Sequence, residues 1–184
     1  HLLVVGAGRV ASLMPAAYSA VRKLQSVKVW NRHPEPAEKL VAQLRAQGFN
    51  ASVASDLKAA VETSNIVTAA TLSTQPLILG AWVQPGTHVD LIGGFRENMR
   101  EADDALVANA ALFADTKMAW VEAGDFIHPI KWGLIEANAI TTLDKLCSGQ
   151  HPCRSDDNQI TLFKSVGSAL ADIAAASLAY SRLD

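Results

Sequence analysis

The fold is decided by the stretch Leu2-Leu3-Val4-Val5-Gly6-Ala7-Gly8-Arg9-Val10-Ala11. An apolar run of β-type residues leads directly into the pattern G-x-G-x-x-A, and a helix-compatible segment follows. In this context Gly6 permits a tight turn, Gly8 lets a pyrophosphate approach the backbone, and Ala11 keeps the helix close to the strand. The helix N-terminus offers free N–H groups and a partial positive charge to the phosphates. The stretch therefore predicts a dinucleotide-binding turn, with an ordinary strand–turn–helix corner as the alternative.

The composition is that of a well-packed globular domain. Of the 184 residues, 49% are hydrophobic and 18% are charged, and the net charge is -2. One domain is the natural expectation for this length. The charge gives no reason to expect nucleic acid or an acidic membrane as a partner, and no apolar run is long enough to span a bilayer.

Two cysteines, Cys147 and Cys153, flank a loop near the C-terminal end. We expect them to be reduced thiols of a cytoplasmic protein. Together with His151 they provide too few ligands at suitable spacing for zinc, so no metal site is expected.

The rest of the chain alternates between strand-like and helix-like segments. Strands are expected at 2–5, 27–30, 51–53, 66–70, 89–92 and 111–114. Helices are expected at 10–24, 34–47, from Ser55 or Asp56 to Glu62, at 100–109 and at 167–183. The last of these carries an apolar stripe that includes Leu170, Ile173, Ala174 and Leu178. Such alternation predicts an α/β fold of the Rossmann type, a doubly wound, mostly parallel sheet with helices on both faces.

The residues after the second strand bear on the choice of cofactor. In domains that bind NAD, an acidic residue at this strand tip accepts hydrogen bonds from the ribose hydroxyls. Here the strand is followed by Asn31-Arg32-His33, which carries no carboxylate. An arginine fork suits a 2′-phosphate, so the sequence favours NADPH, with NADH binding more weakly. The alternative is that Arg32 is a solvated loop residue beside Glu35.

Further motifs run in order along nearly the whole chain. They are Gly6-Ala7-Gly8, Asn31-Arg32, Ala70-Thr71-Leu72-Ser73, Pro76-Leu77, Pro85-Gly86-Thr87-His88-Val89, Ile92-Gly93-Gly94-Phe95, Met99-Arg100-Glu101-Ala102-Asp103, Glu122-Ala123-Gly124-Asp125 and 160–167 (ITLFKSVG). Together these motifs resemble the ornithine cyclodeaminase/mu-crystallin family. Within it, Gly93-Gly94-Phe95 and the segment 99–104 are most similar to bacterial reductases of Δ1-pyrroline-2-carboxylate and Δ1-piperideine-2-carboxylate, the ketimine reductases.

The resemblance implies a protein of two domains. Residues 1–184 correspond to the NAD(P)-binding Rossmann domain, and the helix at about 167–183 is expected to pack towards a substrate and dimerisation domain that this chain lacks. A homodimer formed through that domain is implied. The basic residues that hold the substrate carboxylate in this family are expected there too, so no catalytic residue is assigned in this chain.

The resemblance also implies roles for individual residues. Those expected to contact the cofactor are Gly6, Gly8, Arg9, Val10 and Ala11 at the pyrophosphate, Asn31, Arg32 and His33 at the ribose phosphate, Ala70 and Thr71 in the dinucleotide groove, and Ile92, Gly93 and Ser165 near the nicotinamide. Those expected to contact the substrate are Phe95, Val166 and Gly167.

Several of these motifs have simpler structural explanations. Thr71 and Ser73 could cap a turn, and Gly93-Gly94 could serve only a tight turn. For Glu122 and Asp125, a structural loop around Gly124 is favoured over a catalytic carboxylate pair. Lys164 fits a substrate carboxylate and a structural ion pair equally well.

Phe95 departs from the pattern of the ornithine cyclodeaminases, which carry an acid–base aspartate there. A phenylalanine cannot transfer a proton, so the resemblance favours NADPH-dependent reduction of a preformed cyclic imino acid to proline or pipecolate. Two alternatives stay open. One is an ornithine cyclodeaminase or an amino-acid oxidoreductase like alanine dehydrogenase, and the other is a non-catalytic NADPH-binding protein like mu-crystallin.

Overall fold

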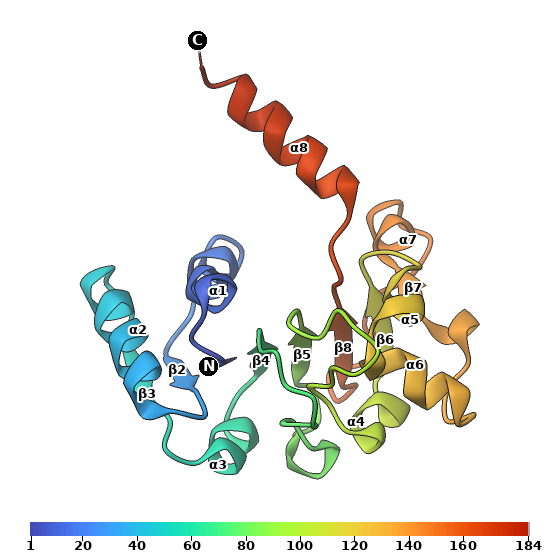
Figure 1. The fold of residues 1–184 in the computed structure, drawn as a ribbon, viewed down its shortest axis with the longest axis horizontal. Coiled ribbons are helices and arrows are strands. Elements are labelled where there is room, and N and C mark those ends of the chain that lie inside the picture. The colour runs from blue at the N-terminus through green and yellow to red at the C-terminus, as the bar shows by residue number, and fades with distance from the viewer. Residues whose placement is uncertain (184) are drawn as a thin grey trace.

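A computed structural model describes residues 1–183 and contains an eight-stranded, entirely parallel sheet with helices on both faces (Figure 1). The strand order is β3-β2-β1-β4-β5-β8-β6-β7. The strands are β1 (Leu2–Val5), β2 (Val27–Trp30), β3 (Ala51–Val53), β4 (Ile66–Ala69), β5 (His88–Leu91), β6 (Ala111–Ala114), β7 (Thr141–Thr142) and β8 (Thr161–Lys164). The predicted Rossmann-type α/β class is confirmed.

Two hydrophobic cores lie on opposite faces of the sheet. On one face, α1 (Arg9–Ser19) and α2 (Pro34–Ala46) pack against β1 and β2. On the other, α3 (Leu57–Glu62), α4 (Asp104–Asn109), α5 (Ala119–Glu122) and α6 (Gly124–Lys131) pack against β1, β4, β5, β6 and β8. The remaining helices are α7 (Leu143–Cys147), α8 (Ala169–Tyr180) and two short 3-10 helices, η1 (Gly80–Trp82) and η2 (Ala137–Ala139).

The first half of the chain begins and ends its elements at recognisable local signals. Pro34 opens α2, and Gly48 follows that helix with a φ of 90° that favours glycine. The side chain of Asp56 caps α3 by accepting a hydrogen bond from the Ala59 N–H at 3.1 Å. The prediction that α1 reaches residue 24 is wrong, because the Tyr18 carbonyl accepts from the N–H groups of Val21 and Arg22 in a turn that leads to β2.

The order of the strands places a topological switch point between β1 and β4. From β1 the chain runs outward through β2 to β3, and it then returns to β4 on the other side of β1. Open α/β sheets bind ligands at such a point, outside the carboxyl ends of the strands. Gly6 follows β1 there with a φ of 106°, and a Cβ on it would lie 2.7 Å from the Ala70 carbonyl oxygen. Only glycine therefore fits this turn.

The helix expected at 100–109 starts four residues late. Residues 100–102 are not helical, and Ala102 forms a parallel bridge with Ile78 instead. Asp103 then caps α4, because its Oδ1 accepts from the N–H of Leu106 at 2.9 Å and from that of Gly80 at 2.8 Å. The sequence pattern also missed β7, β8 and the helices α5, α6 and α7. The strands expected at 66–70 and 89–92 differ from β4 and β5 by a single residue at their ends.

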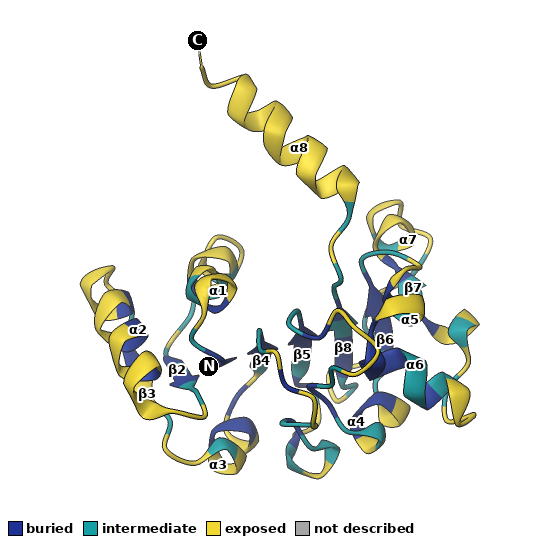
Figure 2. Cartoon of the chain, viewed as in Figure 1, coloured by how far each residue is buried: buried dark blue, intermediate teal, exposed yellow. Residues whose placement is uncertain are grey.

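The C-terminal helix α8 is shorter than the expected 167–183 and projects away from the sheet (Figure 1). It is exposed along its whole length (Figure 2). Leu170 is 76% exposed, Ile173 62% and Leu178 54%. These apolar side chains therefore pack against nothing in the sheet. None of the helices within residues 1–183 is long and apolar enough to cross a membrane.

Candidate dinucleotide site at the carboxyl edge of the sheet

The glycine turn after β1 leaves open space at the start of α1. Gly8 is the N-cap residue of α1, it is exposed, and a Cβ on it would meet nothing within 4 Å. A hollow of about 270 Å³ adjoins it, lined by Ala7, Gly8, Arg9, Ser12, Pro36, Lys39, Leu40 and Gln43. The turn therefore offers the N-terminus of an eleven-residue helix to an anionic group.

The loop after β2 presents its polar side chains to solvent. The Asn31 side-chain amide donates to the His33 carbonyl at 2.9 Å and so shapes the loop, while Arg32 and His33 are exposed. Glu35 forms an ion pair with Lys39 at 2.7 Å. Glu35 thus forms its ion pair within α2 rather than with Arg32. Arg32 lies just after β2, where a ribose phosphate is expected.

The ends of β4 and β5 meet in close contact. The Thr71 hydroxyl donates to Glu101 Oε1 at 2.8 Å, and the Ser73 hydroxyl donates to the Gln75 carbonyl at 2.7 Å, so both side chains do hold the turn. A Cβ on Gly93 would overlap the backbone of Thr71, and one on Gly94 would lie 2.9 Å from Asp125 Oδ2. The two glycines have no positive φ. Close approach of neighbouring segments, rather than a tight turn, requires them.

The turn after β8 is organised by a residue that the sequence analysis did not single out. A single oxygen of Asp115, Oδ2, accepts from the Ser165 hydroxyl at 2.7 Å and from the N–H groups of Val166 and Gly167 at 2.9 and 2.7 Å. Asp115 directly follows β6, which neighbours β8 in the sheet. Its place after a buried apolar strand was the signal that could have identified it.

A buried cluster of three charges lies beneath these turns. Lys164 at the end of β8 is fully buried, with its Nζ 3.4 Å from Asp125 Oδ2 and 3.9 Å from Glu101 Oε2. Of the two roles considered for Lys164, the structure shows the structural ion pair. Burial raises the pKa of Glu101 to about 7, against the lowering effects of Lys164 and of the Thr71 donors.

Glu122 and Asp125 do not form a catalytic pair. Glu122 is exposed at the end of α5, whereas Asp125 is buried in the first turn of α6. Asp125 Oδ1 accepts from the N–H groups of Glu101 and Ala102 at 2.8 and 3.1 Å. The expected structural role is correct, but the segment is the junction of two helices rather than a loop.

Phe95 lies on the loop that follows β5 and is 42% exposed. The Arg96 guanidinium lies 5.5 Å from the centre of its ring.

Every residue expected to contact cofactor or substrate follows the carboxyl end of β1, β2, β4, β5 or β8. The fold brings them to one edge of the sheet.

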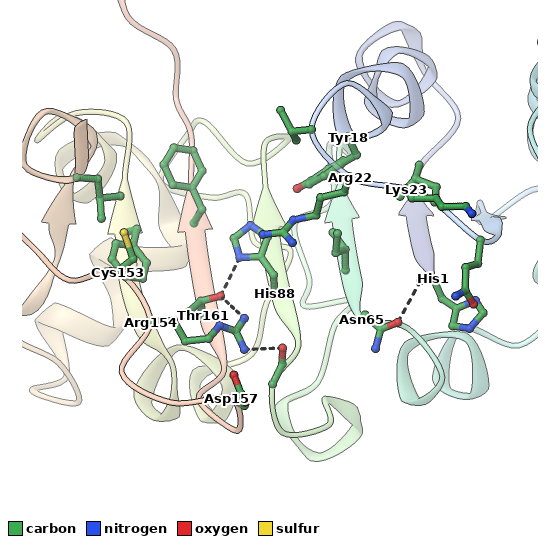
Figure 3. A pocket seen from close by; sticks show the side chains of 18 residues that line it. His1, Tyr18, Arg22, Lys23, Asn65, His88, Cys153, Arg154, Asp157 and Thr161 are labelled. Carbon is green, nitrogen blue, oxygen red and sulfur yellow. Dashed lines mark hydrogen bonds between the residues drawn. The ribbon is translucent and has the colours of Figure 1, made fainter. Parts of the chain in front are cut away.

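A separate groove of about 980 Å³ runs from α1 across the strands and towards their amino ends (Figure 3). Its lining includes the side chains of His88 and Thr161, which are joined by a hydrogen bond of 2.9 Å. Burial and the neighbouring Arg154 lower the pKa of His88 to about 4. Because its lining includes none of the residues that follow the carboxyl ends of the strands, this groove is distinct from the candidate dinucleotide site.

The cysteines and possible metal ligands add no further site within residues 1–183. Cys147 and Cys153 are free and exposed. No group of three or more metal-ligating side chains occurs in this described part of the chain. The carboxyl edge offers an exposed helix N-terminus and close glycine turns above a buried charge cluster, an arrangement that suits an anionic ligand.

The fold and this edge define a dinucleotide-binding domain of the Rossmann type. The chain belongs to the ornithine cyclodeaminase/mu-crystallin family, whose profile matches residues 1–184.

Several named proteins are similar to this chain over nearly its whole length. The chain is 45% identical over 181 residues to Delta(1)-pyrroline-2-carboxylate reductase of Paracoccus denitrificans, covering 96% of this chain and 57% of the relative. The structure of the Thermococcus litoralis Delta(1)-pyrroline-2-carboxylate reductase in complex with NADH and L-proline superposes with a TM-score of 0.94 at 32% identity, covering 98% of this chain and 57% of that one. An archaeal alanine dehydrogenase dimer with bound NAD gives a TM-score of 0.91 at 25% identity, with 98% and 56% covered. The chain thus spans little more than half the length of these relatives.

Proposed function

We propose that the protein containing this chain reduces a cyclic imino acid, Δ1-pyrroline-2-carboxylate or Δ1-piperideine-2-carboxylate, to proline or pipecolate with NADPH. The observation that carries the proposal is the likeness, over 98% of the chain, to a reductase that holds NADH and L-proline. The residues of the carboxyl edge fit a dinucleotide, because Gly8 leaves the N-terminus of α1 open to a pyrophosphate.

The roles proposed for the chain's own residues are binding and orientation. A bound nicotinamide would supply a hydride to the carbon of the C=N bond, and a proton already on the iminium nitrogen, or one taken from water, would complete the saturated amine. Ile92 and Gly93 line the place of the ring, and Ser165, held by Asp115, borders it. Phe95 gives the pocket an apolar wall and cannot exchange a proton with the substrate. This arrangement suits a substrate that is already electrophilic.

The proposed preference for NADPH rests on the loop after β2. The solved relatives contain NADH or NAD, so they support a nicotinamide cofactor without the 2′-phosphate. In this chain the strand tip carries Asn31 and an exposed Arg32 and no carboxylate that would repel a phosphate. We therefore propose that both cofactors bind and that NADPH binds more tightly.

A second domain is proposed to complete the site. The relatives are longer than this chain, and α8 exposes apolar side chains along its length. We propose that α8 packs against that domain, that the domain supplies the basic residues for the substrate carboxylate, and that it joins two subunits into a homodimer like that of the alanine dehydrogenase. The exposed, unpaired thiols of Cys147 and Cys153 suit the reducing cytoplasm proposed for the protein.

Two assays of the full-length protein test the reaction. With Δ1-pyrroline-2-carboxylate and NADPH we expect oxidation of NADPH and formation of proline. With ornithine and NAD we expect no release of ammonia. Ammonia from the second assay, with no NADPH oxidation in the first, would replace the proposal by cyclodeamination and would show that another residue does the work of the missing aspartate.

A further inference from the structure

Four hydrogen-bond donors at the ends of β4 and β5 converge on one buried carboxylate. Glu101 Oε1 accepts from the Thr71 N–H at 2.7 Å and from the Thr71 hydroxyl at 2.8 Å. Glu101 Oε2 accepts from the N–H groups of Gly93 at 2.8 Å and Gly94 at 3.2 Å. The Glu101 side chain is fully buried, so water does not compete for these bonds. One side chain therefore joins the turn after β4 to the turn after β5.

Glu101 is itself fixed from several directions. Its N–H donates to Asp125 Oδ1 at 2.8 Å, and its carbonyl accepts from the N–H groups of Leu77 and Ile78, each at 2.9 Å. Lys164 provides the positive charge that offsets the two buried carboxylates. Lys164 and the turns at Thr71 and at Gly93-Gly94 therefore hold the Glu101 carboxylate, while Asp125 and the segment Leu77-Ile78 hold its backbone.

These bonds also decide which backbone donors remain for a ligand. The N–H groups of Thr71, Gly93 and Gly94 follow strand ends, where a ligand is expected, yet they are turned onto Glu101. The N-terminus of α1 is left to receive the phosphates. The turns after β4 and β5 would then contribute to ligand binding through their shape, and Glu101 determines that shape.

We propose that Glu101 is a positioning residue that fixes the turns after β4 and β5 for the nicotinamide half of the dinucleotide. This inference rests on the proposed function for the identity of the cofactor. The adenosine half is expected at Gly8, Asn31 and Arg32, none of which contacts Glu101. Loosening the carboxylate should therefore disturb one half of the cofactor and spare the other.

Two variants of the full-length protein test this separation. Glu101→Gln keeps the size of the side chain but replaces one acceptor oxygen by an amide that faces backbone donors. Glu101→Asp keeps a carboxyl group near Lys164, but its side chain is one methylene shorter, so we expect it to lose bonds to Thr71 or Gly93. Glu97→Gln, an exposed glutamate on the loop after β5, is the matched control. The probes are NADPH and 2′-phospho-ADP-ribose, which lacks the nicotinamide, and their dissociation constants are measured by calorimetry.

We expect both Glu101 variants to bind NADPH at least about tenfold more weakly and the fragment within about twofold of the wild type, while Glu97→Gln changes neither. If Glu101→Gln fails to fold, Glu101→Asp decides the outcome. Equal weakening of both probes, or no weakening in folded Glu101→Asp, would overturn the positioning role and leave the proposed function intact. A wild-type protein that binds neither probe would instead overturn the cofactor proposal, and the positioning role with it.

Discussion

The two halves of the carboxyl edge hold their turns in different ways. At β1 and β2 the turns are shaped by glycine and by one local side-chain bond, from Asn31 to the His33 carbonyl, and Gly8 and Arg32 are exposed. At β4, β5 and β8 the turns are held by acidic side chains that come from elsewhere in the chain. Glu101 holds the first two turns and Asp115 the third.

Because of this difference, substitutions in one half should affect ligand binding and substitutions in the other should affect stability. In the β1–β2 half we expect an exposed side chain to contribute to ligand affinity and little to the stability of the fold. Its replacement should therefore change ligand binding alone. In the β4–β5–β8 half the charges are buried, and removing one leaves others without partners. Replacements there should lower stability first.

The largest expected effect is that of Lys164→Met. The substitution leaves Glu101 and Asp125 buried without the positive charge that faces both. Breaking a buried ion pair by removing one partner costs about 3–5 kcal/mol of unfolding free energy, to be measured by denaturant unfolding. Lys117→Met, at an exposed lysine between β6 and α5, is the control and should stay within about 0.5 kcal/mol of the wild type. Equal losses from the two variants would show that the buried cluster does not brace this half.

A pair of glycine substitutions compares the two halves directly. An alanine Cβ at Gly93 overlaps the backbone of Thr71, whereas at Gly8 it meets nothing within 4 Å. We expect Gly93→Ala to lower the unfolding free energy by about 3 kcal/mol, as overpacking at an inflexible site does. Gly8→Ala should leave stability unchanged and weaken dinucleotide binding, because its methyl group stands where the pyrophosphate approaches. Similar stability losses in the two variants would contradict the distinction.

The pH dependence of stability follows from the raised pKa of Glu101. The pKa is about 7 in the folded chain against an ordinary value of 4.5, so the folded state binds the proton more tightly. The stability that this proton contributes is present below about pH 4.5 and is lost as the pH rises through 7, by up to about 3 kcal/mol.

Subtracting the profile of Glu101→Gln from that of the wild type isolates this effect. His88, whose lowered pKa acts in the opposite sense as the pH falls from 6.5 to 4, is present in both proteins and cancels. A difference that stays flat between pH 4.5 and 7 would show that burial does not raise the pKa of Glu101.

The same division explains part of what could be predicted from the sequence, since the apolar strands β5 and β6 of the second half were also predicted. The elements up to β4 carry local signals, such as Pro34 and Asp56 at helix starts and glycine after β1. The 66–70 strand was likewise placed by its apolar run. The strand β8 ends in Lys164, and the reason a lysine can be buried there lies at Glu101 and Asp125, far away in the sequence. Long-range partners of this kind leave no local pattern.

The early start predicted for α4 failed for the same reason. Arg100, Glu101 and Ala102 have helix-compatible sequence, but the backbone groups of Glu101 and Ala102 are bonded to Asp125, Leu77 and Ile78 rather than within a helix. The predicted site residues do lie together, because each of them follows a strand and parallel strands end at one edge. The individual roles of those residues remain predictions.

The smallest expected effect belongs to the exposed half and concerns Arg32. Arg32 follows the tip of β2, where no carboxylate would repel a phosphate. Arg32→Ala should therefore weaken NADPH binding by about 1–3 kcal/mol, the usual contribution of a hydrogen bond to a charged group. NADH lacks the 2′-phosphate and should bind within about twofold of its wild-type affinity. Unfolding free energy should not change, since the side chain is exposed. Titrating both cofactors against the variant measures the difference. Arg22→Ala, an exposed arginine at the opposite edge of the sheet, should alter neither affinity. Equal losses of affinity for NADPH and NADH would mean that Arg32 shapes the loop rather than binds the 2′-phosphate. The two halves of the carboxyl edge would then differ less in the roles of their side chains than the burial of those side chains indicates.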